Sequence, residues 1–326
     1  MKKHLMDEIL HVLPVSLREM IRAELEQRGQ GSGEISRYGK CCGQRRGQIQ
    51  EIRLRTGRPI HVLVDGREEA IGGNRLLTTG DMQETMEFVS RFSMYAYEDE
   101  IRQGFLTVKG GHRVGIAGKA VLNNGTLKTI RNISFIHIRI ACEYRDCAKE
   151  LLPYLYENGV LQSTLIFSAP GKGKTTIMRD LIRLISDGNR CGEPLSVAVI
   201  DERGELAACD QGVPQNDLGA RTDVMDGCPK SAGMRLMLRS MAPAVLAADE
   251  IGGEEDVEAV FEAAGCGCVM LATAHGESLE RLMKKEAFQK LKQAAVFQRY
   301  VQLDGGSCPG KCKAVYDAEG RRLCSG

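Results

Sequence analysis

The sequence predicts an α/β fold built on a parallel sheet, preceded by a smaller α+β domain. Apolar runs of strand length alternate with helical patterns through the second half of the chain, which is typical of a parallel sheet covered by helices. A glycine-rich segment at 168–176 lies between one such strand and one such helix, in the order that a phosphate-binding P-loop requires. We therefore expect an N-terminal domain over 1–148 and a P-loop domain over 149–326.

The elements of the second half are predicted from apolar runs and from apolar residues at helical spacing. The strands are expected over 164–167, 196–200, 244–248 and 268–273. The helices are expected over 175–186, 231–241, 254–264 and 278–293.

The sequence of the first half of the chain predicts a mixed α+β domain that has no recognisable catalytic cluster. Amphipathic helices are expected up to about residue 28, and Pro14 interrupts them. The Gly-, Arg- and Ser-rich stretch at 29–47 predicts a mobile loop. The further elements are strands over 51–55 and 60–64, a helix over 81–92, a hairpin-like region over 104–117 and a strand over 136–140.

The composition argues against nucleic acid as a partner and against a membrane span. The net charge of the 326 residues is +1, the chain has no Trp, and aromatic residues make up 5%, so base-stacking platforms are scarce. Acidic residues interrupt any signal-peptide core near the N-terminus, and the apolar stretch from Ala263 to Ala274 is too short to cross a bilayer. We expect a cytoplasmic protein.

The twelve cysteines do not predict a disulfide framework, because a reducing cytosol disfavours disulfides. Their spacing lacks the two paired motifs of a common zinc site. Cys266 and Cys268 are expected in a buried strand, where cysteine is a small apolar residue. A metal site at Cys308, Cys312 and Cys324 is a minor alternative.

The P-loop predicts binding of ATP with Mg²⁺. Gly171 and Gly173 lack Cβ, so the backbone can direct several N–H groups at one anion, and the following helix adds its positive N-terminal end. Lys174 can reach the β- and γ-phosphates, and the Thr175 hydroxyl can ligate Mg²⁺. The predicted nucleotide-binding residues are Ser168, Ala169, Pro170, Gly171, Lys172, Gly173, Lys174, Thr175 and Thr176.

One position of the loop departs from the motif. Ser168 stands where the first glycine is expected. Serine is small enough for the turn to form, but the substitution bears on loop geometry and on ATP affinity. The alternative reading of the segment is a glycine-rich turn that contains a lysine by chance.

Acidic residues follow two predicted strands and supply candidates for the metal ligand and the base. Asp249 and Glu250 end an apolar strand as a Walker B motif does, so Asp249 is expected at Mg²⁺ and Glu250 at the attacking water. Glu202 follows another strand, and strand ends of open α/β sheets face the ligand. Glu250 and Glu202 are therefore both candidates for the base, although either could be a solvated or ion-paired acid.

Histidine and arginine residues complete the predicted site. His275 follows the strand over 268–273 and could sense the γ-phosphate or orient water, unless it is structural. Phosphoryl transfer gains from cationic charge near the γ-phosphate, supplied within the chain or by a neighbouring subunit. The candidates are Arg221, Arg235 and Arg239, with Arg113, Arg131 and Arg139 in the first domain. Each of them could instead form a surface salt bridge.

The four strand-end motifs together resemble those of the type II and type IV secretion ATPases and the pilus retraction ATPases. They are 168–176, Asp201-Glu202-Arg203-Gly204-Glu205, Asp249-Glu250-Ile251-Gly252 and Ala272-Thr273-Ala274-His275-Gly276. More closely, the chain resembles the stage III sporulation protein AA family of spore-forming Firmicutes. The supporting stretches are 51–59, 111–115, 130–134, 137–141 and 216–224. The resemblance is poor over 29–47 and after Gly305.

The resemblance implies a RecA-like P-loop NTPase core and an ATPase of the mother cell, on the cytoplasmic side of the membrane. Such an ATPase would energise a secretion-like channel around the forespore, as a hexamer, through membrane-protein partners. Two alternatives stay open. One is a RecA-like ATPase that depends on nucleic acid, and the other is a nucleotide-dependent assembly scaffold with negligible turnover.

Overall fold

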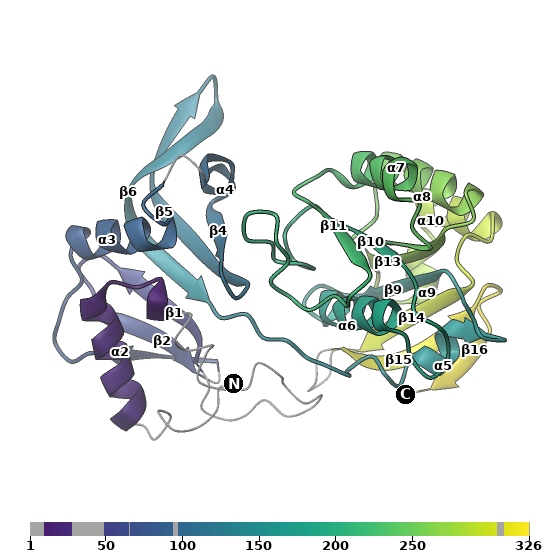
Figure 1. The fold of residues 1–326 in the computed structure, drawn as a ribbon, viewed down its shortest axis with the longest axis horizontal. Coiled ribbons are helices and arrows are strands. Elements are labelled where there is room, and N and C mark those ends of the chain that lie inside the picture. Colours follow the sequence, from purple (N-terminus) through teal and green to yellow (C-terminus); the bar gives the residue numbers. More distant parts are fainter. Residues whose placement is uncertain (1–9, 28–48, 65, 94–96, 305–309, 326) are drawn as a thin grey trace. The chain divides into compact units, whose positions relative to one another are not determined.

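The computed structural model describes residues 10–27, 49–64, 66–93, 97–304 and 310–325 (Figure 1). The loop predicted over 29–47 lies outside them. The described residues form two compact units, and the chain passes from the first to the second between Cys142 and Glu143. The sequence predicts this boundary after residue 148.

The first unit is a six-stranded antiparallel sheet with the strand order β3-β2-β1-β6-β5-β4. Its strands are β1 (Ile49–Arg55), β2 (Ile60–Val64), β3 (Arg67–Ile71), β4 (Phe105–Val108), β5 (His112–Asn123) and β6 (Thr126–Arg139). Its helices are α2 (Val15–Gln27), α3 (Thr79–Val89) and α4 (Glu98–Gln103). Buried and half-buried residues alternate along β2 and β4, so the core covers one face of this sheet.

The second unit contains an eight-stranded sheet with the order β11-β10-β12-β13-β9-β14-β15-β16. Its strands are β9 (Thr164–Ser168), β10 (Val197–Asp201), β11 (Thr222–Asp226), β12 (Val245–Ala248), β13 (Val269–His275), β14 (Arg299–Asp304), β15 (Lys311–Asp317) and β16 (Arg322–Ser325). The strands from β11 to β14 run parallel, and β15 and β16 continue the sheet antiparallel.

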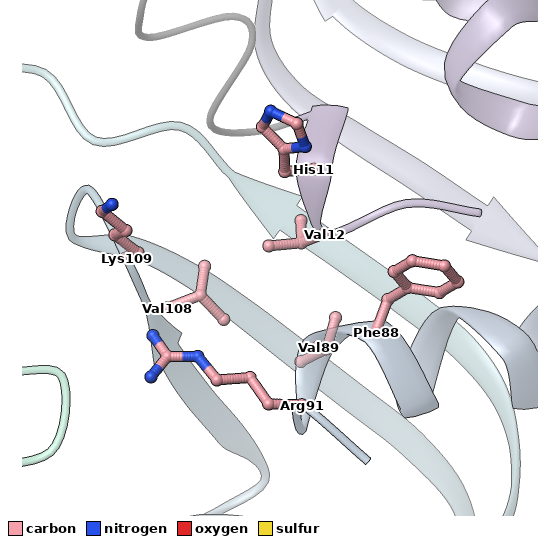
Figure 2. Close-up of a pocket in the computed structure, with 7 residues that line it drawn as sticks. All are labelled: His11, Val12, Phe88, Val89, Arg91, Val108 and Lys109. Carbon is pink, nitrogen blue, oxygen red and sulfur yellow. The ribbon is translucent and has the colours of Figure 1, made fainter. Parts of the chain in front are cut away.

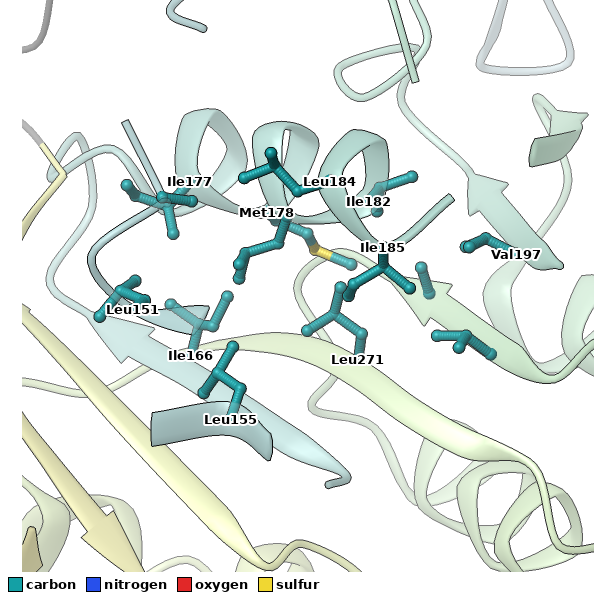
Figure 3. Close-up of a cluster of buried hydrophobic side chains, with 14 of the residues drawn as sticks. Leu151, Leu155, Ile166, Ile177, Met178, Ile182, Leu184, Ile185, Val197 and Leu271 are labelled. Atoms are coloured by element: carbon teal, nitrogen blue, oxygen red, sulfur yellow. The ribbon is translucent and has the colours of Figure 1, made fainter. Parts of the chain in front are cut away.

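Helices cover both faces of this sheet. They are α5 (Leu152–Leu155), α6 (Lys174–Asp187), α7 (Lys230–Met241), α8 (Glu254–Gly265), α9 (Leu279–Leu282) and α10 (Glu286–Gln293), and a short β7 (Tyr156–Glu157) and β8 (Val160–Leu161) form a separate ribbon. Figure 3 shows α6 packing Met178 and Ile185 towards Ile166 and Leu271 of the sheet. Residues of α7, α8 and α10 share a core with Leu165 and Phe167, which alternate with Ile166.

Some elements differ from the sequence predictions. The single helix predicted over 278–293 is wrong, because α9 ends at Leu282 and α10 begins at Glu286. In the break between them, Lys285 Nζ donates to His275 O at 3.0 Å. The predicted strand 136–140 is the end of a much longer strand, β6, whose first residues pair with β5 in an exposed ribbon. Exposed ribbons bury few apolar residues, so their sequence pattern is weak.

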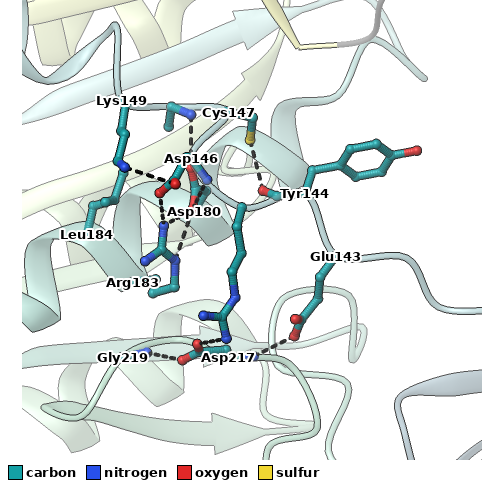
Figure 4. A network of polar contacts seen from close by, with 12 residues as sticks. Glu143, Tyr144, Asp146, Cys147, Lys149, Asp180, Arg183, Leu184, Asp217 and Gly219 are labelled. Carbon is teal, nitrogen blue, oxygen red and sulfur yellow. Dashed lines mark hydrogen bonds and ion pairs between the residues drawn. The ribbon is translucent and has the colours of Figure 1, made fainter. Parts of the chain in front are cut away.

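Buried polar contacts anchor the start of the second unit to α6 (Figure 4). The Asp180 carboxylate on α6 accepts from the backbone N–H of Asp146 at 3.1 Å and of Ala148 at 2.9 Å. Arg183 donates to the same carboxylate at 2.7 Å. The segment before α5 is therefore fixed to α6, the helix that follows the glycine-rich loop.

Candidate nucleotide-binding site

The loop between β9 and α6 has the backbone that its glycines permit. Gly171 and Gly173 have φ of 71° and 86°, in the region where side chains are strained. Ser168 is the last residue of β9, and its φ is not positive. Its hydroxyl donates to Ala169 O at 2.9 Å. Serine therefore fits at this position without backbone strain, so the loop can form although Ser168 stands where the motif has its first glycine.

The start of α6 suits an anion. Its N-cap is Gly173, which provides no side-chain cap, and the first turn contains no acidic residue, so backbone N–H groups remain for a ligand. Lys174 is 5% exposed. Among the described residues no carboxylate forms an ion pair with its ammonium, and burial lowers its pKa although Glu250 and Asp249 oppose the shift. A buried cation at a helix N-terminus fits the phosphates of a nucleotide.

Asp249 lies beside the Thr175 hydroxyl. Thr175 Oγ1 donates to Asp249 Oδ2 at 2.9 Å, and the Thr273 hydroxyl donates to Oδ1. Burial raises the pKa of Asp249, and these two hydrogen bonds act against the shift. A hydroxyl and a carboxylate in contact at the end of β12 are hard oxygen ligands of the kind that Mg²⁺ prefers.

Glu250 and His275 form a chain of contacts with the P-loop lysine. Lys174 Nζ lies 3.2 Å from His275 Nδ1, and His275 Nε2 lies 2.8 Å from Glu250 Oε1. Since the ammonium can only donate, Nδ1 accepts and the ring proton lies on Nε2, facing Glu250. Arg203 Nη1 donates to Glu250 Oε2 at 2.5 Å. The structure therefore brings Lys174, His275 and Glu250 together.

Glu202 is directed to a different partner. Its carboxylate forms an ion pair with Lys230 at the start of α7. The neighbouring Asp201 is buried and accepts from the backbone N–H groups of Glu205, Leu206 and Ala207 at 2.7–3.0 Å. Asp201 thus shapes the loop after β10. The partner of Glu202 is Lys230, so Glu202 is not part of the series of contacts from Glu250 through His275 to Lys174.

The arginine candidates of the second unit lie away from the P-loop. Arg221 precedes β11 and donates to Ser186 O at 3.3 Å, at the edge where the parallel strands begin. Arg235 pairs with Glu262 of α8 at 2.9 Å, and Arg239 lies exposed in the last turn of α7. In the first unit, Arg113 stacks on Phe105 with 3.5 Å to the ring centroid. Arg131 and Arg139 are exposed on β6.

Three residues at this site were given no role of their own by the sequence reasoning. Thr273 is fully buried and joins Asp249 to Glu250, since its hydroxyl also accepts from Glu250 N at 2.8 Å. Arg203 pairs with Glu250. Arg179 of α6 donates to the carbonyls of Glu205 and Leu206 at 2.7 and 3.1 Å and holds the loop after β10. A threonine before a strand-end histidine was the one available signal.

The remaining features lie outside this site. A cavity of about 460 Å³ in the first unit is lined by His11, Val12, Phe88, Val89, Arg91, Val108 and Lys109 (Figure 2). Of the alternative cysteine site, Cys308 lies outside the described residues, and Cys312 and Cys324 pack partly buried against the core of the second unit. In the described part of the chain no cluster of three or more His, Cys, Asp and Glu could hold a metal ion.

Comparisons with known proteins identify the family to which this chain belongs. The family model described as "Sporulation stage III, protein AA" matches residues 33–323. The chain belongs to this family. Stage III sporulation protein AA of Bacillus subtilis (strain 168) is 38% identical over 318 residues, which cover 98% of this chain and 97% of that protein. Protein SEEDLING PLASTID DEVELOPMENT 1 of Arabidopsis thaliana is 28% identical over 51% of this chain and 24% of its own length.

Solved structures show the same fold as this member of the family. The ATPase DotB of Legionella pneumophila has a TM-score of 0.53 at 16% identity, covering 88% of this chain and 83% of its own. The pilus retraction motor PilT, solved with bound ADP, has a TM-score of 0.55 at 17% identity, covering 78% and 74%. The predicted RecA-like core with a preceding α+β unit is confirmed as a fold. None of the described helices is long and apolar enough to cross a bilayer.

Proposed function

We propose that this chain binds ATP and Mg²⁺ at its P-loop and hydrolyses ATP. One observation supports the proposal most strongly. The buried Lys174 at the start of α6 lies 3.2 Å from His275, which pairs with Glu250, while Thr175 contacts Asp249. In this proposal the phosphate-binding lysine, the oxygen ligands of Mg²⁺ and the base lie together at the carboxyl ends of the parallel strands.

Each residue has a role in this proposal. Lys174 and the N–H groups of the loop bind the phosphates, and Thr175 and Asp249 hold Mg²⁺, which neutralises phosphate charge when bound. Glu250 orients the attacking water and accepts its proton at a carboxylate oxygen. His275 keeps its Nε2 proton towards Glu250. Glu202 is the weaker candidate for the base, since Lys230 holds its carboxylate.

The first test is ATP binding and steady-state hydrolysis by wild type and by Lys174→Ala. We expect loss of tight binding or of turnover, because the substitution removes the buried cation. Lys284→Ala is the matched control, since Lys284 is exposed in the same unit and should turn over as wild type does. Turnover of Lys174→Ala within a few-fold of wild type would refute the assignment of the P-loop.

The wider role that we propose is that of a motor for a secretion-like channel between mother cell and forespore. Family membership and the fold shared with secretion ATPases support it. The protein would act as a hexamer on the cytoplasmic side, through membrane-protein partners. The test is replacement of the Bacillus subtilis relative by this chain. Restoration of spore formation by wild type and not by Lys174→Ala is the expected outcome.

An oligomer would also supply an arginine to a neighbouring site. Arg235 already pairs with acids of its own unit, so Arg131 and Arg139 of the first unit are the better candidates. An arginine acting in trans contributes roughly 10³-fold or more to phosphoryl transfer. Mixing Arg139→Ala with Lys174→Ala should then restore part of the activity. A monomer by light scattering that turns over fully with ATP and Mg²⁺ would exclude this mechanism.

One observation favours a nucleic-acid-dependent ATPase as a second candidate. Residues 101–142 contain seven Lys and Arg and no Asp or Glu, so β4 to β6 form a cationic region within a nearly neutral chain. ATP turnover measured with and without single-stranded DNA or RNA separates the two candidates. If the protein is a channel motor, neither DNA nor RNA should stimulate its ATP turnover. Binding of ATP without turnover under all conditions would support the scaffold instead.

A further inference from the structure

Arg203 and His275 contact different oxygens of the Glu250 carboxylate. Arg203 Nη1 donates to Oε2 at 2.5 Å, while His275 Nε2 lies 2.8 Å from Oε1. The Arg203 side chain is 63% exposed and that of Glu250 is 21% exposed. Both oxygens of the carboxylate are thus held by partners on different strands, since Arg203 follows β10 and His275 ends β13.

The backbone of Glu250 is fixed as well. Its φ is 53°, in the left-handed region that a glutamate rarely adopts. Its N–H donates to Thr273 Oγ1 at 2.8 Å, and Ile251 N donates to Thr273 O at 2.9 Å. Because the main chain is held, the remaining freedom of Glu250 is rotation of its side chain, and Arg203 and His275 limit that rotation.

The two acids that precede Arg203 in sequence already have partners. The carboxylate of Glu202, its neighbour in sequence, is paired with Lys230. Asp201 accepts from three backbone N–H groups. Arg203 is therefore directed to Glu250, although Glu202 is the nearest acid along the chain.

We propose that Arg203 is a positioning residue that holds the Glu250 carboxylate where it can orient the attacking water. The inference rests on the proposed ATPase function and assigns a role to a residue outside the P-loop and the Walker B strand. An exposed ion pair contributes little to stability, so the consequence of losing this pair is a misplaced base. Small displacements of a catalytic group reduce the rate by up to roughly 10²-fold.

The test is a set of variants measured for kcat, for KM of ATP and for thermal stability. Arg203→Ala should lower kcat by about 10- to 100-fold and leave KM within about threefold. Arg203→Lys should recover part of the loss, because lysine restores the charge without the planar fork. Arg321→Ala is the matched control, since Arg321 is an exposed arginine paired with Asp317 at 2.7 Å, and it should act as wild type.

A double variant separates positioning from a general effect. If Arg203 acts through Glu250, adding Arg203→Ala to Glu250→Gln should lower single-turnover hydrolysis by no more than about twofold further. An equal loss in both backgrounds would overturn the inference, as would an unchanged kcat or a raised KM with unchanged kcat. A fall in melting temperature that parallels the fall in kcat for Arg203→Ala and Arg203→Lys would indicate a structural role and overturn it too.

The inference and the proposed function can fail separately. If wild type hydrolyses ATP, Lys174→Ala does not, and Arg203→Ala is fully active, then only the inference fails. If wild type has no ATPase activity, both fail. Direct ATP binding by all Arg203 variants excludes a simple loss of the nucleotide as the cause of a low kcat.

Discussion

The two units of the molecule use β-sheets in different ways. In the first unit, half-buried and buried positions alternate along strands such as β2 and β4, so partly exposed side chains are spread along the length of the sheet. In the second unit, every residue of β9, β10 and β12 is buried, so polar groups are confined mainly to the strand ends. The carboxyl ends of parallel strands lie at the same edge of the sheet, so the polar side chains that can bind a ligand are concentrated at that edge.

The units differ in charge as well. Residues 1–142 contain 22 Lys and Arg against 16 Asp and Glu, whereas residues 143–326 contain 22 against 27. The near-neutral total of the chain thus conceals a cationic first part and an acidic second part. We therefore expect the carboxyl ends of the strands in the second unit to be sensitive to single polar substitutions, and the strands of the first unit to tolerate them.

The largest effect is expected at the base. Glu250→Gln should retain ATP binding and lower turnover by about 100-fold or more, because it removes the carboxylate and keeps the shape. Glu202→Gln is the matched control and should lower turnover by less than about fivefold, since Glu202 is paired with Lys230. Steady-state ATPase assays decide between them, and the reverse result would move the base to the end of β10.

Loss of a buried hydroxyl near the carboxyl ends of the parallel strands should lower turnover more than loss of one where the strands begin. Thr273→Val leaves the Glu250 N–H and an oxygen of Asp249 without a partner, which should destabilise the fold by about 1–2 kcal/mol and lower turnover about tenfold. Thr164→Val removes a buried hydroxyl from β9 that donates to Gln162 O at 2.8 Å. It should keep normal turnover, and equal losses in both variants would contradict the comparison.

The buried Asp249 should make stability depend on pH. Burial raises the pKa of this carboxyl above its usual 3.8, so the folded state disfavours the charged form and loses stability as pH rises through the raised value. Asp249→Asn removes this cost and should be more stable than wild type by about 1 kcal/mol near neutral pH. The difference should shrink as pH falls through the raised pKa of Asp249.

Denaturant unfolding at several pH values measures this difference in stability. Asp180→Asn is the control of opposite sign, because Asp180 is a buried carboxylate that accepts two backbone N–H groups and an Arg183 donor. Its loss should destabilise the protein at neutral pH. A less stable Asp249→Asn at neutral pH would show that burial of Asp249 is fully offset by its hydrogen bonds.

The smallest effect is expected on the exposed sheet of the first unit. Arg55 and Arg53 lower the pKa of Glu68 to about 2, with the hydrogen bond from Arg55 as the largest cause. This contribution is present above pH 4.5, the ordinary value, and is lost as pH falls towards the lowered one. Glu68→Gln should cost less than about 1 kcal/mol and leave ATP turnover unchanged. A turnover defect would mean that this sheet takes part in the reaction.

Much of the second unit could be predicted from local sequence. The loop at 168–176, the start of α6 at Lys174 and the acids at 249 and 250 follow from neighbouring residues, because glycine conformations, helix starts and apolar strands are local properties. The strands β14 to β16 were not predicted, since they join the sheet beside β9 after a long separation in sequence. Strand order depends on packing that a periodic pattern does not encode.

The sequence alone predicts a glycine-rich loop after a buried strand, and acids and a histidine after other strands. Which of these groups come into contact depends on the folded sheet. Glu250 contacts His275 and Glu202 contacts Lys230 because strand register and the direction of each side chain are set by the packed sheet. Thr273 and Arg203 acquire their partners for the same reason, since residues distant in sequence come into contact only when the parallel strands align.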